Sequence, residues 1–231
     1  MQTLAITWLG HSSFRVRTPG GNELLFDPWF TGNPSFPEAA RPAKADLILV
    51  SHGHFDHLTD AAALAKSTGA TVVGIWEIYR YLGTKGVQNL EPMNKGGTIT
   101  VKGLRITMTD ARHSSSFEDN GVHYLGEAAG FVVKLENGQT IYYAGDTALF
   151  GDMKLIAELY KPDIAFLPIG DRFTMGPDTA AIAAKWLGVK QVVPMHCETF
   201  PQLTGTVEQL EQYLAGSGID VLKLKPGETA E

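Results

Sequence analysis

Short apolar or alternating runs recur along the chain, separated by turn residues or by segments with helical spacing. Such runs, bounded by glycine, proline, asparagine or aspartate, predict strands. The strands are expected at Leu4–Leu9, Ser13–Thr18, Glu23–Phe26, Leu47–Val50, Thr71–Val73, Thr98–Val101, Leu104–Thr109, Gly130–Leu135, Thr140–Tyr143, Ile164–Leu167, Gln191–Pro194 and Val221–Leu224. Helical patterns predict helices at about Thr59–Ser67, Trp76–Lys85, Met153–Tyr160, Asp178–Leu187 and Val207–Ala215.

Three dipeptides mark hairpin turns between the expected strands. Gly20-Gly21, Lys102-Gly103 and Asn137-Gly138 each lie between alternating runs. Hairpins at both ends of the chain, with strand–helix units between them, predict two mixed sheets with helices outside, an α/β or α+β protein. No low-complexity linker interrupts the sequence, so we expect residues 1–231 to form a single domain.

Composition narrows the class of protein further. The chain has 231 residues, 44% of them hydrophobic and 19% charged, as in ordinary soluble globular proteins. A formal charge of −6 without a run of Lys and Arg argues against nucleic-acid binding. Cys197 is the single cysteine, so no intrachain disulfide can form and a reducing compartment is indicated. Since no signal-peptide pattern and no stretch near ~18 apolar residues is present, we expect a cytoplasmic protein without membrane insertion.

The segment Ser51–His57 carries three histidines and an aspartate. Alternate residues of an extended segment share a face, so His52 and His54 can bind one ion. Asp56 and His57 lie where a helix is expected to begin, and they can turn toward a second ion. Imidazole and carboxylate groups hold zinc-like cations at about 2.0–2.2 Å. The segment therefore predicts a metal centre rather than a solvated histidine-rich loop.

A histidine or aspartate also follows strand after strand in the expected order. In layered α/β proteins, ligand sites lie beyond strand ends, in the loops found there. One such residue is usually a turn residue or a helix cap, but this many in one chain indicate a shared edge where metal ligands collect. The residues at these ends are His11, Asp27, His52, His113, Asp146, Asp171 and His196.

This arrangement resembles the metallo-β-lactamase superfamily, whose defining motif is HxHxDH followed by a distant His, Asp and His. The matching positions are His52, His54, Asp56, His57, His113, Asp146 and His196. The segments Trp8-Leu-Gly-His-Ser-Ser-Phe14, Asp56-His-Leu58 and Leu167-Pro-Ile-Gly-Asp-Arg-Phe-Thr-Met-Gly176 are similar to those of a group of uncharacterised metal-dependent hydrolases. That group is related to bacterial lactonases acting on sugar phosphates and to the phospholipase D that releases N-acylethanolamines. The resemblance covers essentially the whole chain.

The resemblance implies a fold, a ligand set and a nucleophile. The fold would be a four-layer αβ/βα sandwich with helices outside two facing sheets. Two divalent ions would be bound, with zinc expected and manganese or iron as alternatives. A water shared between them would have its pKa lowered toward ~7 and supply hydroxide. The implied ligands are His52, His54 and His113 for one ion and Asp56, His57 and His196 for the other, with Asp146 bridging both.

Some residues are candidates for roles beside the metal ligands. Asp56, His11 and Asp171 are the candidate catalytic residues, although His11 could instead orient a ligand or cap a turn. Asp27 could accept the remaining N–H of a ligand histidine, as outer carboxylates commonly do, or serve only as a turn residue.

Other positions leave alternatives open. Arg112 and Arg172 flank candidate site residues, and either could bind a phosphate or carboxylate through two hydrogen bonds, or be an ordinary surface charge. The proline-rich aromatic segment 28–42 is typical of a lid. Trp29, Phe30 and Phe36 within it would shape an apolar pocket, or contact a second subunit in a homo-oligomer.

Three kinds of residue near the candidate ligands have ordinary structural explanations. Ser114, Ser115 and Ser116 could donate hydrogen bonds to substrate, but a serine-rich loop is the simpler interpretation. Cys197 is expected to be a buried structural thiol. His123 lies in a polar segment and is expected to be exposed.

The leading hypothesis is a hydrolase in which a metal-bridging hydroxide attacks a carbonyl or phosphorus centre. Its substrate would be a small ester, lactone or phosphodiester that carries negative charge. An iron-dependent redox enzyme with the same ligands is one alternative. A noncatalytic metal-stabilised binding protein is the other.

Overall fold

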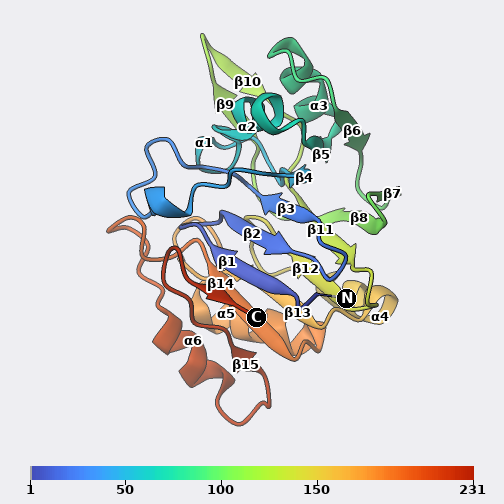
Figure 1. Cartoon of the computed structure of the whole chain (residues 1–231). Coiled ribbons are helices and arrows are strands. Elements are labelled where there is room, and N and C mark those ends of the chain that lie inside the picture. Colours follow the sequence, from blue (N-terminus) through green and yellow to red (C-terminus); the bar gives the residue numbers. More distant parts are fainter. Residues whose placement is uncertain (1) are drawn as a thin grey trace.

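Two mixed β-sheets face each other in the computed structural model, which describes residues 2–231 (Figure 1). The first sheet has the strand order β16-β1-β2-β3-β4-β5-β6. β1, β2 and β3 are antiparallel neighbours, whereas β3 to β6 run parallel. The strands are β1 (Ala5–Trp8), β2 (Phe14–Arg17), β3 (Glu23–Phe26), β4 (Leu47–Leu49), β5 (Thr71–Ile75), β6 (Leu90–Met93) and β16 (Thr229–Ala230).

The second sheet has the strand order β15-β14-β13-β12-β11-β8-β7. β12 to β15 run parallel, and β12, β11, β8 and β7 are antiparallel neighbours. Its strands are β7 (Thr98–Val101), β8 (Leu104–Asp110), β11 (Ala129–Lys134), β12 (Thr140–Tyr143), β13 (Ile164–Pro168), β14 (Gln191–Met195) and β15 (Asp220–Val221). A separate hairpin pairs β9 (Ser116–Glu118) with β10 (Val122–Tyr124).

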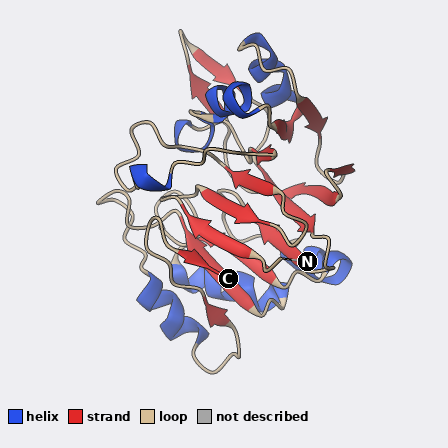
Figure 2. Ribbon diagram, viewed as in Figure 1, coloured by secondary structure: helices blue, strands red, loops and turns tan. Residues whose placement is uncertain are grey.

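Helices lie on the outer faces of both sheets (Figure 2). α2 (Ala61–Thr68) and α3 (Trp76–Thr84) pack against the first sheet. α4 (Met153–Tyr160), α5 (Pro177–Leu187) and α6 (Val207–Leu214) form the layer outside the second sheet. A single helical turn, α1 (Phe55–Leu58), precedes α2, and a 3₁₀ turn spans Glu38–Ala40. This arrangement confirms the expected αβ/βα sandwich.

Aromatic side chains join the two sheets in the core. Phe26 of β3 stacks on Tyr143 of β12 with ring centroids 4.4 Å apart, and Phe14 of β2 meets Phe166 of β13 at 4.9 Å. All four side chains are fully buried. Burying one large apolar side chain stabilises the fold by roughly 1.5–3 kcal/mol, so these contacts hold the two sheets in a fixed position relative to each other. The relative position of the sheets determines which strand ends meet at the candidate site.

The structure departs from the predicted elements mainly at sheet edges. The last predicted strand, Val221–Leu224, is wrong in its bounds, because β15 pairs with Gln191 and Val192 through Asp220 and Val221. β6, β9, β10 and β16 were not predicted. The predicted helix Thr59–Ser67 corresponds to α2 (Ala61–Thr68), and the separate helical turn α1 before it, which was not predicted as an element of its own, contains Asp56 and His57.

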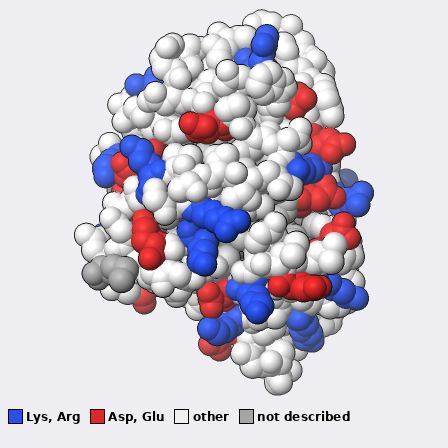
Figure 3. Space-filling model, turned by 90° about the vertical axis from the view of Figure 1, so that its right-hand side faces the viewer, with Lys and Arg blue, Asp and Glu red and all other residues white. Residues whose placement is uncertain are grey.

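The helix lengths and the surface charges are relevant to the expectation of no membrane insertion and no nucleic-acid partner. Within residues 2–231, no helix combines the length and the apolar character required to span a bilayer. On the face shown in Figure 3, basic and acidic side chains are interspersed, with one small basic cluster near its middle.

Candidate metal centre

Loops that follow strands of both sheets converge on one site. His52 follows β4, and the helical turn α1 then presents Asp56 and His57. From the second sheet, the loops after β8, β12 and β14 bring in three further side chains. These are His113, Asp146 and His196.

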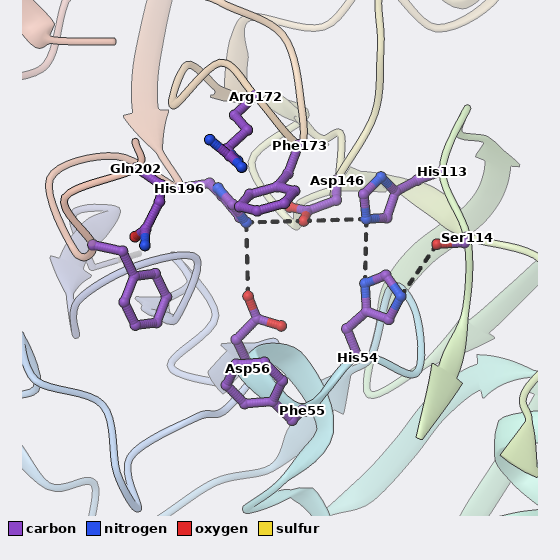
Figure 4. Close-up of a pocket in the computed structure, with 11 residues that line it drawn as sticks. His54, Phe55, Asp56, His113, Ser114, Asp146, Arg172, Phe173, His196 and Gln202 are labelled. Atoms are coloured by element: carbon purple, nitrogen blue, oxygen red, sulfur yellow. Dashed lines mark hydrogen bonds and ion pairs between the residues drawn. The ribbon is translucent and has the colours of Figure 1, made fainter. Parts of the chain in front are cut away.

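The first group of donors contains three imidazoles. His52 Nε2 lies 3.0 Å from His54 Nδ1. His113 Nε2 lies 3.2 Å from the same His54 nitrogen (Figure 4). Donor atoms of the three residues all lie within 4.8 Å of one another. His52 is fully buried, whereas His54 and His113 are half-buried and face a cavity.

The second group contains one carboxylate and three imidazoles. His11, Asp56, His57 and His196 are buried and offer donor atoms within 4.8 Å of one another. His11 Nε2 lies 3.0 Å from Asp56 Oδ2. The Nε2 atoms of His57 and His196 lie 3.8 Å and 3.7 Å from that oxygen. His11 therefore belongs to this group by geometry, in addition to the residues that the family resemblance implies.

Asp146 lies between the two groups. Its Oδ2 is 3.0 Å from His196 Nε2 and 3.4 Å from His57 Nε2 in the second group. The same oxygen is 3.6 Å from His113 Nε2 and 3.9 Å from His52 Nε2 in the first. One carboxylate thus reaches both groups of donors.

The donor set fits bound cations. Tetrahedral ligands at 2.0–2.1 Å from zinc are separated from one another by about 3.3 Å, which is close to the separations found in both groups. His57 Nε2, His196 Nδ1 and Asp146 Oδ1 are buried without a hydrogen-bond partner within residues 2–231. Unpaired buried polar atoms are costly, so an orphaned set of this kind calls for an ion or water.

Asp27 fixes the orientation of two of these histidines. His57 Nδ1–H donates to Asp27 Oδ2 over 2.7 Å, which is the hydrogen bond that was expected between Asp27 and a candidate ligand histidine. Ser51 Oγ–H donates to the same oxygen over 2.5 Å and lies 3.0 Å from His52 Nδ1. His52 Nδ1–H must then donate to Ser51, because the Ser51 proton is already used. Both histidines consequently present Nε2 to the centre.

Burial and charge shift the proton affinities of these groups in opposite directions. Burial, reinforced by neighbouring imidazoles, lowers the pKa of His52 well below its usual value and the pKa of His11 to about 4. Burial also opposes a charge on His57 and His196. The nearby carboxylates, led by Asp146, overcome it and raise the pKa of His57 well above its usual value and that of His196 to about 9.

The local backbone of several site residues is in the left-handed region. His11, Asp27 and His196 have φ values of 56°, 42° and 52°. Such conformations cost of order 1–3 kcal/mol for residues other than glycine and cluster at functional sites. Gly145 (φ 61°) precedes Asp146, and a Cβ there would lie 2.8 Å from Ala129 O. This close approach brings Asp146 to its place beside the histidines.

A cavity of about 550 Å³ opens over the two groups of donors (Figure 4). Its remaining wall consists of aromatic and polar side chains from other loops. Of these wall residues, only Ser114 and Arg172 are candidates from the sequence. The lining residues are His54, Phe55, Asp56, His113, Ser114, Asp146, Arg172, Phe173, His196, Phe200 and Gln202.

Three of the candidates do not join the cluster. Asp171 is exposed and is not among the residues that line the cavity. Arg112 also lies outside the lining, and its Nε is 3.1 Å from Asp110 Oδ2. Ser115 is buried and structural, because its Oγ accepts a hydrogen bond from Gly53 N–H at 3.0 Å.

Two further predictions about single residues are confirmed. Cys197 is buried, and burial raises the pKa of its thiol to about 12. His123 is exposed and its Nε2 lies 2.7 Å from Asp119 O.

The segment 28–42 supports the cavity wall from behind. Trp29 is buried and lies 5.5 Å from the Phe55 ring and 5.9 Å from the Phe200 ring. The carboxylate of Asp60 accepts hydrogen bonds from the backbone N–H groups of Phe30 and Thr31, at 2.6 and 2.9 Å. The segment is thus packed against its own chain, and Trp29 shapes the pocket through the two phenylalanines in front of it.

Comparison with known proteins defines the class and then the family. Residues 22–197 match the family model described as the beta-lactamase superfamily domain. A UPF0173 metal-dependent hydrolase of Rubrobacter xylanophilus is 52% identical over 228 residues, covering 96% of this chain and 94% of the relative. A UPF0173 metal-dependent hydrolase of Methanopyrus kandleri is 48% identical, covering 99% of this chain and 100% of the relative.

Solved structures agree with this placement. The metallo hydrolase Igni18 of Ignicoccus hospitalis superposes with a TM-score of 0.89 at 36% identity, covering 99% of this chain and 98% of Igni18. The chain belongs to the UPF0173 metal-dependent hydrolases of the beta-lactamase superfamily. It is a metal-dependent hydrolase, which removes the redox and noncatalytic alternatives as primary functions.

Proposed function

We propose that this hydrolase uses two divalent ions, one at each group of donors. His52, His54 and His113 would hold the first ion. Asp56, His57 and His196 would hold the second. The single observation that carries this assignment is the position of Asp146, whose Oδ2 lies within 4 Å of imidazole nitrogens from both groups. Zinc is the ion that this nitrogen-rich set suits best.

When bound, the ions would supply a nucleophile from water near neutral pH and polarise a carbonyl or phosphoryl oxygen. The chain's residues do the rest. Asp146 and Asp56 line the cavity and place negative charge beside the reacting centre. The buried imidazoles hold these carboxylates in place, since the pKa of Asp56 and that of Asp146 lie below their usual range despite burial, lowered by neighbouring histidines.

His11 acts in this proposal by positioning Asp56. Its Nε2 lies 3.0 Å from Asp56 Oδ2, and its Nδ1 lies 2.9 Å from Thr199 Oγ1. A residue held at both nitrogens cannot rotate, so it keeps the carboxylate in one orientation. His11 does not line the cavity, which favours this role over direct contact with substrate. Asp171 also lies outside the lining, and its contribution is to the turn that carries Arg172.

The substrate in this proposal is a small ester, lactone or phosphodiester with negative charge. The cavity volume of about 550 Å³ is in the range of small-molecule sites. Ser114 Oγ in the lining lies 3.3 Å from His54 Nε2, but in this proposal His54 is bound to the first ion and is not free to act as the base of a serine nucleophile. An attacking water fits this site better than a serine nucleophile.

Hydrolysis assays on metal-reconstituted protein test the proposal. We expect turnover of at least one ester, lactone or phosphodiester in a panel, with two ions bound per chain. His54→Ala and Asp146→Ala should each lower kcat by at least about 100-fold. His123→Ala is the matched control, because His123 is exposed and lies outside the cavity. Full activity in both site variants would contradict the mechanism.

A further inference from the structure

Several side chains of the cavity wall belong to neither donor group and form a second kind of surface beside the cluster. Phe55, Phe173 and Phe200 supply apolar surface there, and Arg172 supplies a positive charge. Figure 4 shows Arg172 and Phe173 above the cluster and Phe55 below it. The inference from this wall rests on the proposed function, because it names the substrate that the same site would take.

Arg172 is the only lysine or arginine among the lining residues. In the part of the chain that the structure describes, no carboxylate lies within 4.0 Å of its guanidinium. Other arginines near acids behave differently: Arg41 contacts Glu38 at 2.6 and 2.8 Å, and Arg112 contacts Asp110. A guanidinium presents a planar fork of donors that matches a carboxylate or a phosphate. The donors of Arg172 are therefore available to an anion in the cavity.

The backbone holds Arg172 at the cavity in a strained turn. Asp171 and Arg172 are consecutive left-handed residues with φ values of 63° and 49°. Asp171 N–H donates to Met175 O over 3.0 Å, and Met175 N–H donates to Thr147 O over 3.0 Å. Thr147 directly follows Asp146, so the turn is tied to the loop of the central carboxylate. Strain of this kind persists where the surroundings fix it, and it is typical of ligand-binding positions.

The three phenylalanines form an apolar surface that faces solvent. Phe55 and Phe173 are 56% and 55% exposed, so their apolar surface is accessible from the cavity. Phe55 and Phe200 are supported from behind by the buried Trp29. The Arg172 guanidinium lies 5.6 Å from the Phe173 ring, so charge and apolar surface are adjacent.

We propose that the cavity selects an amphipathic anion as substrate. An aryl or alkyl group lies between Phe55, Phe173 and Phe200, and a carboxylate or phosphate away from the hydrolysed bond pairs with Arg172. The hydrolysed bond then lies over the cluster around Asp146. Arg172 and Phe173 are the specificity-determining residues of this site.

Calorimetric binding to the metal-loaded protein tests this directly. The probes are 4-phenylbutanoate, its uncharged amide, butanoate without the ring, and 3-phenylpropylphosphonate. We expect either ring-bearing anion to bind about 10- to 100-fold more tightly than the amide, the range of a charge-assisted hydrogen-bonded pair. The preferred anion of the two identifies carboxylate or phosphate as the natural group.

Variants show whether Arg172 or the metal ions bind the anion. Arg172→Gln should abolish most of the preference for the anion while leaving amide binding within about twofold, and Arg172→Lys should restore part of it. Phe173→Ala should weaken every ring-bearing probe and leave butanoate unchanged. Arg80→Gln is the matched control, since Arg80 is exposed on α3 outside the cavity.

Three outcomes would overturn the inference. If Arg172→Gln bound the anion as tightly as the wild type, the anion would be bound by the metal ions and not by Arg172. If ring-bearing and ringless anions bound equally well, the proposed apolar subsite would be contradicted. If no probe bound at millimolar concentration, both the apolar subsite and the Arg172 anion site would be contradicted. Arg172-dependent binding without hydrolysis of any ester, lactone or phosphodiester would instead defeat the proposed function and leave this inference standing.

Discussion

His57 and Asp27 form the connection between the core of the sandwich and its candidate metal centre. His57 Nδ1–H donates to Asp27 Oδ2 over 2.7 Å, and both side chains are fully buried. Asp27 Oδ2 also lies 2.8 Å from the Tyr143 hydroxyl of the opposite sheet. One carboxylate therefore joins both sheets and directs a candidate ligand, so that packing in the core determines geometry at the site.

Replacing Asp27 should weaken metal binding without removing any ligand. In Asp27→Asn the amide can no longer accept all the hydrogen bonds from His57, Ser51 and Tyr143, so His57 loses its fixed orientation. We expect metal affinity to fall by about 10- to 100-fold, as for other outer carboxylates. Competition with a chromogenic chelator measures this. Asp152→Asn, at an exposed aspartate, is the control, and equal affinities in the two variants would show that Asp27 has no such role.

His11 should affect turnover more than substrate binding. Since it holds Asp56 rather than lining the cavity, His11→Gln should lower kcat by about 10- to 100-fold with little change in KM. Thr199→Val should act in the same direction more weakly, because it removes the partner of His11 Nδ1. Thr199→Ser keeps the hydroxyl and should behave as the wild type. Steady-state kinetics on metal-loaded protein decide the point, and an unchanged kcat in His11→Gln would refute the positioning role.

Metal binding should become tighter as pH rises from 7 to 9. Burial opposes the charge on His196, but Asp146 and Asp56 raise its pKa to about 9, so without metal it carries a proton at neutral pH. A bound ion must displace that proton, which makes the apparent affinity rise by about tenfold per pH unit for each proton released. Calorimetry in buffers with different ionisation enthalpies counts the protons. Equal affinity at pH 7 and pH 9 would contradict this account.

The same shift predicts the opposite trend for stability of the metal-free protein. Because the folded pKa of His196 is above the usual value of 6.5, its pairing with Asp146 stabilises the fold fully below about pH 6.5. That contribution is lost as pH rises through about 9. Urea unfolding of chelated protein should therefore show His196→Gln losing less stability at pH 9.5 than at pH 6, relative to the wild type. A constant difference between the two proteins would count against the ion pair.

A close backbone approach at Gly170 supports the loop that carries His196. A Cβ on Gly170 would lie 2.0 Å from His196 O, so Gly170→Ala must push the two loops apart. We expect a loss of roughly 1–3 kcal/mol in the free energy of unfolding, together with weaker metal binding. Gly151→Ala is the control, because nothing lies within 4 Å of a Cβ there. Similar stability and metal affinity in both variants would argue against this restraint.

Local sequence signals predicted the turns and strands whose conformation is set by residues close in the sequence. Lys102-Gly103 joins β7 and β8 as expected, with both residues at positive φ. The missed strands depend on distant partners: β6 contains Pro92, which suits only an edge position beside β5. The bounds of β15 follow from its register with β14, which no local pattern in Val221–Leu224 indicates.

The site likewise contains residues that the sequence predicted and residues whose positions depend on the whole fold. The histidines and aspartates after strand ends, together with the family resemblance, predicted most of the residues that the structure brings together around Asp146, because these residues follow strands whose ends meet. The cavity wall was not predicted, since Phe173 and Phe200 lie in loops whose positions depend on the whole fold. Asp171 and Arg172 were both candidates, and only the left-handed turn decides that Arg172 lines the cavity while Asp171 does not.

Anomalous diffraction from crystals of the zinc-loaded protein tests the central claim most directly. The account predicts two peaks, one within bonding distance of His52, His54 and His113, and one within bonding distance of Asp56, His57 and His196. The Asp146 carboxylate should contact both ions. A single peak, or a second ion out of reach of Asp146, would contradict it.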